Sequence, residues 1–300
     1  MEFRVSVIIP VYNSFSFLDR SIQSALDQSQ TGEVILIDDR SNDGSWEKCQ
    51  NWLKEDSRVK ILKNEGLKKG AGVTRNLGII NSNFQYIAFL DSDDYYLKNR
   101  FAADEILFRK NSDIDGVYNS VINKVISGDN IKVSLLKYWD GRIIGIKESF
   151  KILKYSDILG CGTHLNGLTI KKSSVLLFDE ELKQTQDVNF FLKLFTEKRI
   201  INSHYNNIVA TYTIHSKNTI SNTKEAFLFR RIGSRKNLIY SFKNSLPCPV
   251  ISRFFKDYLI YDYLIFQNFI EKYNKLSLIL FAPLAILRMP FNFKDKLRDI

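Results

Sequence analysis

Residues 86–94 read Tyr-Ile-Ala-Phe-Leu-Asp-Ser-Asp-Asp, a short apolar run that ends in three carboxylates. A run of this kind is typical of a strand that is buried on both faces of a parallel sheet. Three carboxylates within four residues repel one another unless a cation is bound between them. Divalent ions such as Mg²⁺ and Mn²⁺ prefer carboxylate and phosphate oxygens, so the cluster indicates a metal site. The alternative is a solvated acidic turn or a helix cap.

Three further apolar runs precede this one and are typical of strands: Val5–Val11, Val34–Ile37 and Val59–Leu62. Segments with helical spacing lie between them. This alternation predicts an α/β fold with a doubly wound, Rossmann-like, mainly parallel sheet flanked by helices. Ligands of such sheets bind outside the carboxyl ends of the strands. Asn13 and Asp39 also follow strand ends, so we expect them to converge with the acidic cluster on one crevice.

The composition narrows the classes of partner. The 300 residues carry a formal net charge of +10, which indicates an anionic partner such as nucleic acid, phospholipid headgroups or a phosphorylated substrate. The sequence has neither a Cys/His finger pattern nor an RNA-recognition signature, so we expect no nucleic acid partner. Cys49, Cys161 and Cys248 are odd in number and widely spaced, which indicates a reducing compartment.

Both ends of the chain favour a cytoplasmic protein. The first residues lack the basic region and apolar core of a signal peptide. The longest uncharged apolar run, Leu276–Leu287, is too short to span a bilayer, which needs about 20 residues. From Ala226 onward the chain is basic and aromatic, and a set of apolar residues recurs at helical spacing: Phe254, Tyr258, Tyr261, Leu264 and Ile265. This pattern predicts a helical extension that lies on an anionic membrane surface or packs on the preceding domain.

Four stretches of the N-terminal half together resemble family 2 glycosyltransferases of the GT-A fold, of the type that builds bacterial surface polysaccharides. They are Val5-Ser-Val-Ile-Ile-Pro-Val-Tyr-Asn13, the segment 34–45 ending in Asp-Asp-Arg-Ser-Asn-Asp-Gly-Ser, Gly70-Ala-Gly-Val-Thr-Arg-Asn-Leu-Gly78 and Tyr86–Asp94. Each is a weak pattern alone, but their order and intervals are specific. A further partial match runs from Gly162 to His215.

The resemblance implies an inverting, metal-dependent glycosyltransferase, either a hexosyl- or an N-acetylhexosaminyltransferase. Its donor would be a nucleoside diphosphate sugar, usually a UDP-sugar. Its acceptor would be a hydroxyl of a growing surface glycan such as capsule, O-antigen or lipooligosaccharide, free or lipid-linked, at the cytoplasmic face of the inner membrane. It also implies a GT-A catalytic domain over residues 1–222, with a nucleotide-sugar half (1–115) and an acceptor half (116–222), before the extension over 223–300.

The resemblance assigns donor and metal roles to matching positions. Nine residues would bind the donor: Pro10, Tyr12, Asn13, Asp39, Asp43, Arg75, Asn76, Asp91 and Asp93. Three would bind Mn²⁺ or Mg²⁺: Asp93, Asp94 and His215. Asp39 would meet the base, usually uracil, and Arg75 with Asn76 the diphosphate or ribose. A bound divalent ion stabilises the charge that develops on a departing diphosphate, and Arg75 adds a fixed positive charge.

The acceptor side has one candidate general base. The segment Gln186-Asp187-Val188-Asn189 resembles the family's Glu-Asp pair before a helix, so Asp187 would take the acceptor's proton. Gln186 stands where the family often has Glu, which removes one charge that would raise the pKa of Asp187. The alternative for Asp187 is a helix N-cap. His164 and Asn166 fall where acceptor-side residues would lie.

Three rival functions are weighed against this one. A sugar nucleotidyltransferase or a dinucleotide oxidoreductase would show a glycine-rich loop after the first strand, and the segment Val11-Tyr-Asn-Ser-Phe15 has no glycine. A non-catalytic, membrane-associated sugar-nucleotide-binding protein stays an alternative. Such a protein would tolerate Asp187→Asn, whereas the enzyme would lose turnover and keep donor binding.

Overall fold

A computed structural model describes residues 2–127, 130–135, 154, 163–203, 207–214 and 223–273. The chain divides into two compact units, Met1–Lys217 and Asn218–Ile300. The domain boundary after residue 222, and the division of the first domain into a nucleotide-sugar half (1–115) and an acceptor half (116–222), remain predictions. His215 and the apolar run Leu276–Leu287 lie outside the described residues.

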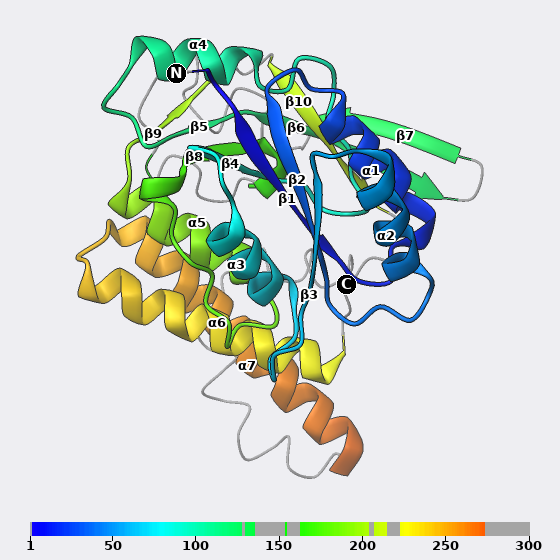
Figure 1. The fold of residues 1–300 in the computed structure, drawn as a ribbon. Coiled ribbons are helices and arrows are strands. Elements are labelled where there is room, and N and C mark those ends of the chain that lie inside the picture. The colour runs from blue at the N-terminus through cyan, green and yellow to red at the C-terminus, as the bar shows by residue number, and fades with distance from the viewer. Residues whose placement is uncertain are drawn as a thin grey trace. The chain divides into compact units, whose positions relative to one another are not determined.

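The first unit is built around a seven-stranded sheet with the order β3-β2-β1-β4-β8-β5-β9 (Figure 1). Its strands are β1 (Val5–Val11), β2 (Thr31–Asp38), β3 (Val59–Lys63), β4 (Tyr86–Phe89), β5 (Gly116–Tyr118), β8 (Leu168–Lys171) and β9 (Ile200–Asn202). All neighbouring pairs are parallel except those of β8, which is antiparallel to β4 and β5. The doubly wound, mainly parallel sheet predicted from the sequence is confirmed, and the antiparallel β8 is an addition.

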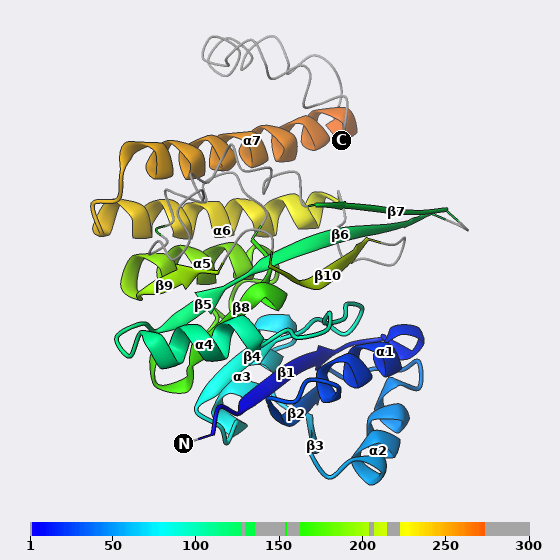
Figure 2. The same ribbon diagram turned by 90° about the horizontal axis from the view of Figure 1, so that it is seen from above.

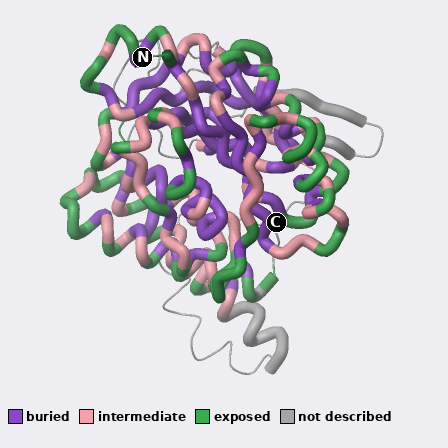
Figure 3. The backbone as a smooth tube through the Cα atoms, in the orientation of Figure 1, coloured by how far each residue is buried: buried purple, intermediate pink, exposed green. Residues whose placement is uncertain are grey.

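Helices flank this sheet (Figure 1). They are α1 (Phe15–Leu26), α2 (Ser45–Glu55), α3 (Ala71–Asn81), α4 (Ala102–Lys110) and α5 (Gln186–Glu197). Helix α3 packs so closely on β1 and β2 that a Cβ at Gly78 would lie 2.5 Å from a methyl carbon of Ile8. The central strands β1 and β2 are almost wholly buried, as Figure 3 shows. This burial explains their uninterrupted apolar runs.

A second sheet of three strands has the order β10-β6-β7 (Figure 2). It comprises β6 (Ser120–Ser127), β7 (Asn130–Leu135) and β10 (Ile208–Ile214). β10 runs parallel to β6, and β6 pairs with β7 in an antiparallel ribbon. An isolated bridge joins Tyr96 to Ala210 of β10, so the segment after the acidic cluster is tied to this sheet.

The second unit contains two helices in its described part, α6 (Lys224–Lys243) and α7 (Cys248–Tyr273), which pack on one another. The Thr223 hydroxyl caps α6 by accepting a hydrogen bond from the Ala226 amide at 3.2 Å. The C-terminal helical extension predicted from the sequence is thereby confirmed. Neither helix, nor any other in the described part of the chain, combines the length and apolar character that a bilayer crossing requires.

Candidate active site

The loops that follow β1, β2 and β4 meet at the carboxyl edge of the sheet. The Ser14 hydroxyl, after β1, lies 2.6 Å from the Ser92 hydroxyl, after β4. The Ser14 amide donates to the Ser45 hydroxyl at 2.9 Å, which links the loop after β2. The convergence expected from strand ends is therefore present in the structure.

The acidic turn after β4 is held by a buried amide from a distant segment. The Asn166 side chain is fully buried in a short 3₁₀ helix, Leu165–Gly167, that leads into β8. Its Nδ2 donates to Asp94 Oδ2 at 2.7 Å, and its Oδ1 accepts from the Asp91 amide at 3.1 Å. The Thr213 amide of β10 donates to the other oxygen of Asp94 at 2.5 Å. Asn166 was expected to lie on the acceptor side. In the structure its buried side chain stabilises the acidic turn by hydrogen bonds to Asp91 and Asp94.

A buried ion pair supports this brace in turn. The Arg100 guanidinium donates from Nε to the Asn166 carbonyl at 3.1 Å and from Nη1 to Asp104 Oδ2 at 2.8 Å. Asp104 also accepts from the Asn119 amide and the Thr169 hydroxyl, at 2.8 and 2.6 Å. A charge pair that is fully buried needs such additional hydrogen bonds. The i, i+4 spacing of Arg100 and Asp104 signals an ion pair in the sequence, but nothing in the sequence connects that pair to Asn166.

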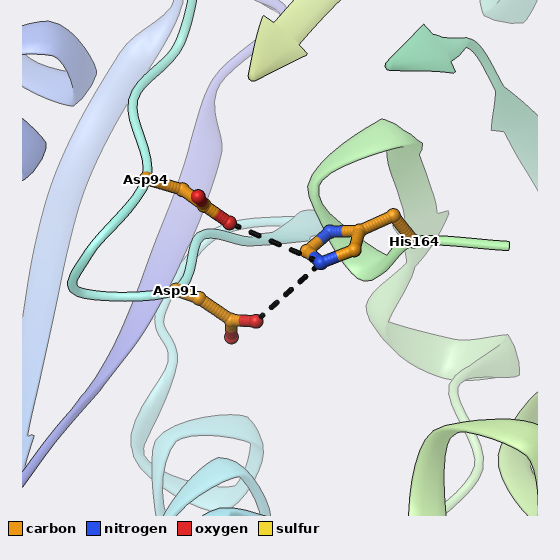
Figure 4. Close-up of side chains that lie close together, drawn as sticks. All are labelled: Asp91, Asp94 and His164. Atoms are coloured by element: carbon orange, nitrogen blue, oxygen red, sulfur yellow. Dashed lines mark ion pairs between the residues drawn. The ribbon is translucent and has the colours of Figure 1, made fainter. Parts of the chain in front are cut away.

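His164 completes the cluster (Figure 4). Its Nε2 lies 3.9 Å from Asp91 Oδ2 and 3.9 Å from Asp94 Oδ2. Its ring contacts the Tyr212 ring at 4.5 Å between centroids, and its amide donates to the Tyr118 hydroxyl at 2.9 Å. The other oxygen of Asp91 accepts from Arg75 Nη2 at 2.5 Å. One imidazole nitrogen, two carboxylates and one guanidinium therefore converge from three separate segments.

Burial sets the ionisation of these groups. Burial and the charges of Asp93 and Asp91 raise the pKa of Asp94 well above its ordinary value. Burial acts in the same direction on Asp91, but mainly the Arg75 charge and its hydrogen bond outweigh it and hold the pKa of Asp91 below its ordinary value. Burial lowers the pKa of His164 and so favours the neutral ring that ligates a metal.

Burial, reinforced by the Asp94 charge, also raises the pKa of Tyr212 to about 12, so its hydroxyl stays protonated at neutral pH.

The cluster fits a divalent cation. One ligand atom from each of Asp91, Asp94 and His164 lies within 4.8 Å of the others. His164 Nδ1 has no hydrogen-bond partner among the described residues, and Nε2 faces both carboxylates. A bound cation would favour the ionised form of Asp94 and so oppose the burial and the neighbouring carboxylate charges that raise its pKa. The two carboxylates are ligands that Mn²⁺ and Mg²⁺ share, and the imidazole adds a nitrogen ligand.

This cluster differs in part from the ligands expected from the sequence. Asp94 belongs to it, whereas His164, expected on the acceptor side, and Asp91, expected on the donor, are the other two members. Asp93 is not a member, and its backbone carbonyl accepts from Arg20 Nη2 at 3.0 Å. His215 follows Ile214, the last residue of β10, and lies outside the described residues.

Asp39 is the central carboxylate of the region where the sequence predicts the nucleotide, which we call the nucleotide side. Its Oδ1 accepts from Asn64 Nδ2 at 2.6 Å and its Oδ2 from the Gly70 amide at 2.7 Å. Gly70 adopts a φ of 122°, which a residue with a side chain rarely reaches. The buried carboxylate thus joins the loops after β2 and β3 to the start of α3. Asp39 is the residue that the sequence analysis expects to meet the base.

The other nucleotide-side residues shape the loops around Asp39. Asp43 accepts hydrogen bonds from the Phe15 amide and from both the amide and the hydroxyl of Ser45. Burial opposes the ionisation of Asp43, but these bonds outweigh it and hold its pKa below the ordinary value. Asn13, with a φ of 48°, accepts from the Asn42 amide at 2.9 Å. Tyr12 is exposed and Pro10 is partly buried beside this loop.

The Asn76 side chain makes hydrogen bonds within the protein, whereas the sequence analysis expects it to contact the donor. Its Nδ2 donates to the Phe178 carbonyl and to Glu180 Oε1, at 3.0 and 3.1 Å, and its Oδ1 accepts from the Phe178 amide at 2.8 Å. The side chain is buried, so it fastens the segment before α5 to α3.

Asp187 lies in the first turn of α5, on the side of the acidic cluster. Its charge acts on the pKa of both His164 and Tyr212. Its Oδ1 accepts from the Val188 amide at 2.8 Å, and the side chain is partly exposed. The neighbouring Gln186 has a buried Oε1 without a hydrogen-bond partner among the described residues. The general-base role of Asp187 stays a prediction.

The chain is similar to known glycosyltransferases in sequence and in fold. The family model described as Glycosyl transferase family 2 matches residues 6–130. The minor teichoic acid biosynthesis protein GgaA of Bacillus subtilis is 32% identical over 204 residues, which cover 65% of this chain and 44% of GgaA. The UDP-Glc:alpha-D-GlcNAc-diphosphoundecaprenol beta-1,3-glucosyltransferase WfgD of Escherichia coli is 34% identical over 140 residues, which cover 46% of this chain and 54% of WfgD. The chain thus spans about half the length, or less, of these relatives.

Among solved structures, residues 1–349 of S. aureus TarS superpose with a TM-score of 0.61 at 18% identity, covering 92% of this chain and 76% of that one. Other crystals of TarS 1–349 contain UDP and UDP-GlcNAc. At this identity the likeness shows the fold, which is the GT-A fold expected from the sequence.

Proposed function

From the match of residues 6–130 to the model described as Glycosyl transferase family 2, we propose that the chain is an inverting, metal-dependent glycosyltransferase. It transfers a hexosyl or N-acetylhexosaminyl group from a UDP-sugar to a hydroxyl of a growing bacterial surface glycan. The observation that carries this proposal is the convergence of Asp91, Asp94, His164 and Arg75 at the carboxyl edge of the sheet. The names of GgaA and WfgD support the surface-glycan class, and WfgD and the TarS complexes support UDP.

The donor is bound across the two sides of the crevice. Asp39 accepts a hydrogen bond from the base, and Asn13 with Asp43 keeps the surrounding loop in place. Arg75, fixed by Asp91, presents its remaining N–H groups to the diphosphate, because its buried Nε has no partner among the described residues. Asp91, Asp94 and His164 would hold a divalent cation, which would act as a Lewis acid on the departing diphosphate.

The transfer itself is a single displacement. The acceptor oxygen attacks the anomeric carbon in line, and the bond from that carbon to the diphosphate oxygen breaks. Asp187 takes the proton of the acceptor hydroxyl as the new bond forms, and UDP leaves as the anion. The products are the extended glycan with inverted anomeric configuration, UDP and protonated Asp187, which returns its proton to solvent.

A donor screen tests the proposal directly. The chain is incubated with individual nucleoside diphosphate sugars, with and without Mn²⁺, and the released nucleoside diphosphate is measured. We expect slow Mn²⁺-dependent hydrolysis of one UDP-sugar in the absence of acceptor. Donor binding without turnover, unaffected by Asp187→Asn, would instead identify a non-catalytic sugar-nucleotide-binding protein. Release of pyrophosphate from a nucleoside triphosphate would identify a nucleotidyltransferase.

We further propose that the enzyme works at the cytoplasmic face of the membrane, where a lipid-linked acceptor would be presented. The basic composition of the second unit supports this: from residue 225 onward, 13 Lys and Arg stand against 6 Asp and Glu. Anionic headgroups attract such a segment.

A further inference from the structure

The second unit presents an exposed apolar face that differs from the one its sequence predicts. Phe254 and Leu264, from the set with helical spacing, are buried, with 2% and 7% of their surface exposed. Six other apolar side chains are between 38% and 61% exposed: Leu228, Ile232, Ile239 and Phe242 of α6, and Phe255 and Leu259 of α7. We call these six residues the outer face.

The members on α6 lie on one side of the helix. Positions 228, 232, 239 and 242 are separated by four, seven and three residues, a spacing that returns to the same side of an α-helix. Arg235 falls within this stripe and is also exposed. On α7, Phe255 and Leu259 are four residues apart and share one side in the same way.

Contacts between the helices place the two stripes on the same side of the pair. Arg231, the residue before Ile232, approaches Asp262 with 2.8 Å between Nε and Oδ1. It also donates to the Tyr258 hydroxyl at 3.0 Å. Tyr258 and Asp262 flank Leu259 in the sequence of α7. The Arg231 side chain therefore crosses between the stripes, and the outer face continues from one helix to the other.

Most charges around the outer face are positive, and the exposed Glu225, three residues before Leu228, is an acidic one at its end. Arg235 lies inside it, and the exposed Lys243 and Lys256 follow Phe242 and Phe255 in the sequence. The nearby acids Asp257 and Asp262 are each paired with an arginine, at 2.6 and 2.8 Å. An apolar stripe with basic residues in and beside it matches the boundary between lipid headgroups and acyl chains. Arginine suits this place because its stem lies along apolar surface while its guanidinium reaches phosphate.

We propose that the outer face docks on an anionic lipid surface. Two other occupants fit less well. An uncharged apolar segment such as Leu276–Leu287 would bury the Arg235 guanidinium without offering it an opposite charge, which is unfavourable. A second copy of the chain in a symmetric contact would bring like charges together. Lipid phosphates satisfy both the apolar and the positively charged parts of the face.

The test compares two isoleucines in the full-length protein. Ile239→Glu removes an apolar residue of the outer face, and the control Ile80→Glu makes the same change at an exposed isoleucine of α3 in the other unit. Binding is measured by sedimentation with vesicles of phosphatidylcholine, with and without phosphatidylglycerol, in the absence of donor and acceptor. We expect the native chain and Ile80→Glu to bind only the anionic vesicles, and Ile239→Glu to bind them about tenfold more weakly.

Further measurements test the role of charge and the alternative of a second copy of the chain. Arg235→Glu is expected to weaken binding to anionic vesicles, and added salt to weaken binding by the native chain. Equal binding by Ile239→Glu and Ile80→Glu, or no binding by the native chain, would overturn the proposal. So would light scattering that shows a dimer in the native chain and a monomer in Ile239→Glu. Thermal unfolding of each variant identifies any that misfolds, in which case Phe255→Glu replaces it. Because sugar transfer is not measured, failure here leaves the proposed reaction untouched.

Discussion

The candidate site has a nucleotide side around Asp39 and an acidic side around Asp91 and Asp94. Both sides hold a carboxylate with a buried side-chain amide, but the bracing residues of the acidic side are much farther away in the sequence. On the nucleotide side, Asn64 braces Asp39, and the two residues are 25 positions apart. On the acidic side, Asn166 braces Asp94 across 72 positions, and Thr213 does so across 119. A buried amide restricts the carboxylate in both cases. The nucleotide side is therefore a product of adjacent βα units, whereas the acidic side needs the whole first unit to be folded.

The sharpest test of the acidic side is removal of its most buried carboxylate. Asp94→Ala should lower Mn²⁺-dependent turnover by about 10³-fold or more. The substitution removes a ligand of the cation that stabilises the negative charge on the leaving diphosphate. Asp93→Ala is the matched control, since Asp93 lies outside the cluster around His164. We expect that variant to keep most of its activity. A comparable loss in both variants, measured as kcat/KM against Mn²⁺ concentration, would instead favour the ligands expected from the sequence, which include Asp93 as well as Asp94.

Asp187 tests whether the acidic side extends to the start of α5. Asp187→Asn should lower kcat by about 10²–10⁴-fold, the range of general-base catalysis, while UDP-sugar binding is retained. Glu197→Gln, at the other end of α5, is the control for a lost carboxylate in the same helix. Calorimetric titration with UDP and steady-state kinetics separate the two effects. Loss of UDP binding in Asp187→Asn would mean that the residue holds the donor rather than the acceptor's proton.

The two bracing asparagines allow a crossed comparison. Asn166→Leu should weaken Mn²⁺ binding by roughly 10–100-fold, as loss of a residue that orients a metal ligand does, and leave metal-free UDP binding less affected. Asn64→Leu should do the opposite, because it releases Asp39 and the Gly70 loop. Manganese binding is followed by electron paramagnetic resonance and UDP binding by calorimetry. Equal loss of both ligands in both variants would show that the sides act as one folding unit and do not bind independently.

The separation in sequence between contacting residues also explains which parts of the fold and of the site could be predicted from the sequence. The strands β1 to β4 and the residues after them were predictable because each apolar run and its turn lie in one continuous segment, as Asp39 and Asp91 illustrate. The resemblance assigned His164 to the acceptor side, and its approach to Asp91 depends on the antiparallel pairing of β8 with β4, which no local pattern indicates. Asn166 and Asn76 were expected on substrates for a similar reason: their polarity is visible in the sequence, but their burial is a property of the tertiary packing.

The pH dependence of stability gives the smallest effect and the clearest difference in sign. The pKa of Asp94 is raised, so the folded metal-free protein binds more protons than the unfolded chain between the ordinary Asp value and that raised value. Its contribution to stability therefore falls as pH rises through this window. The pKa of Asp43 is lowered, so its contribution is present above the ordinary Asp value and is lost as pH falls towards the lowered pKa.

These signs are read from melting temperatures in EDTA. The difference in Tm between the native chain and Asp94→Asn should shrink with rising pH, whereas the difference for Asp43→Asn should grow, each by about a few degrees. Comparing each variant with the native chain at several pH values removes any constant penalty from the altered hydrogen bonds. Added Mn²⁺ should reverse the trend for Asp94 alone, because the cation stabilises the ionised carboxylate. Parallel trends for the two variants would contradict the distinction, since both carboxylates would then respond to the general charge of the chain rather than to the side on which they lie.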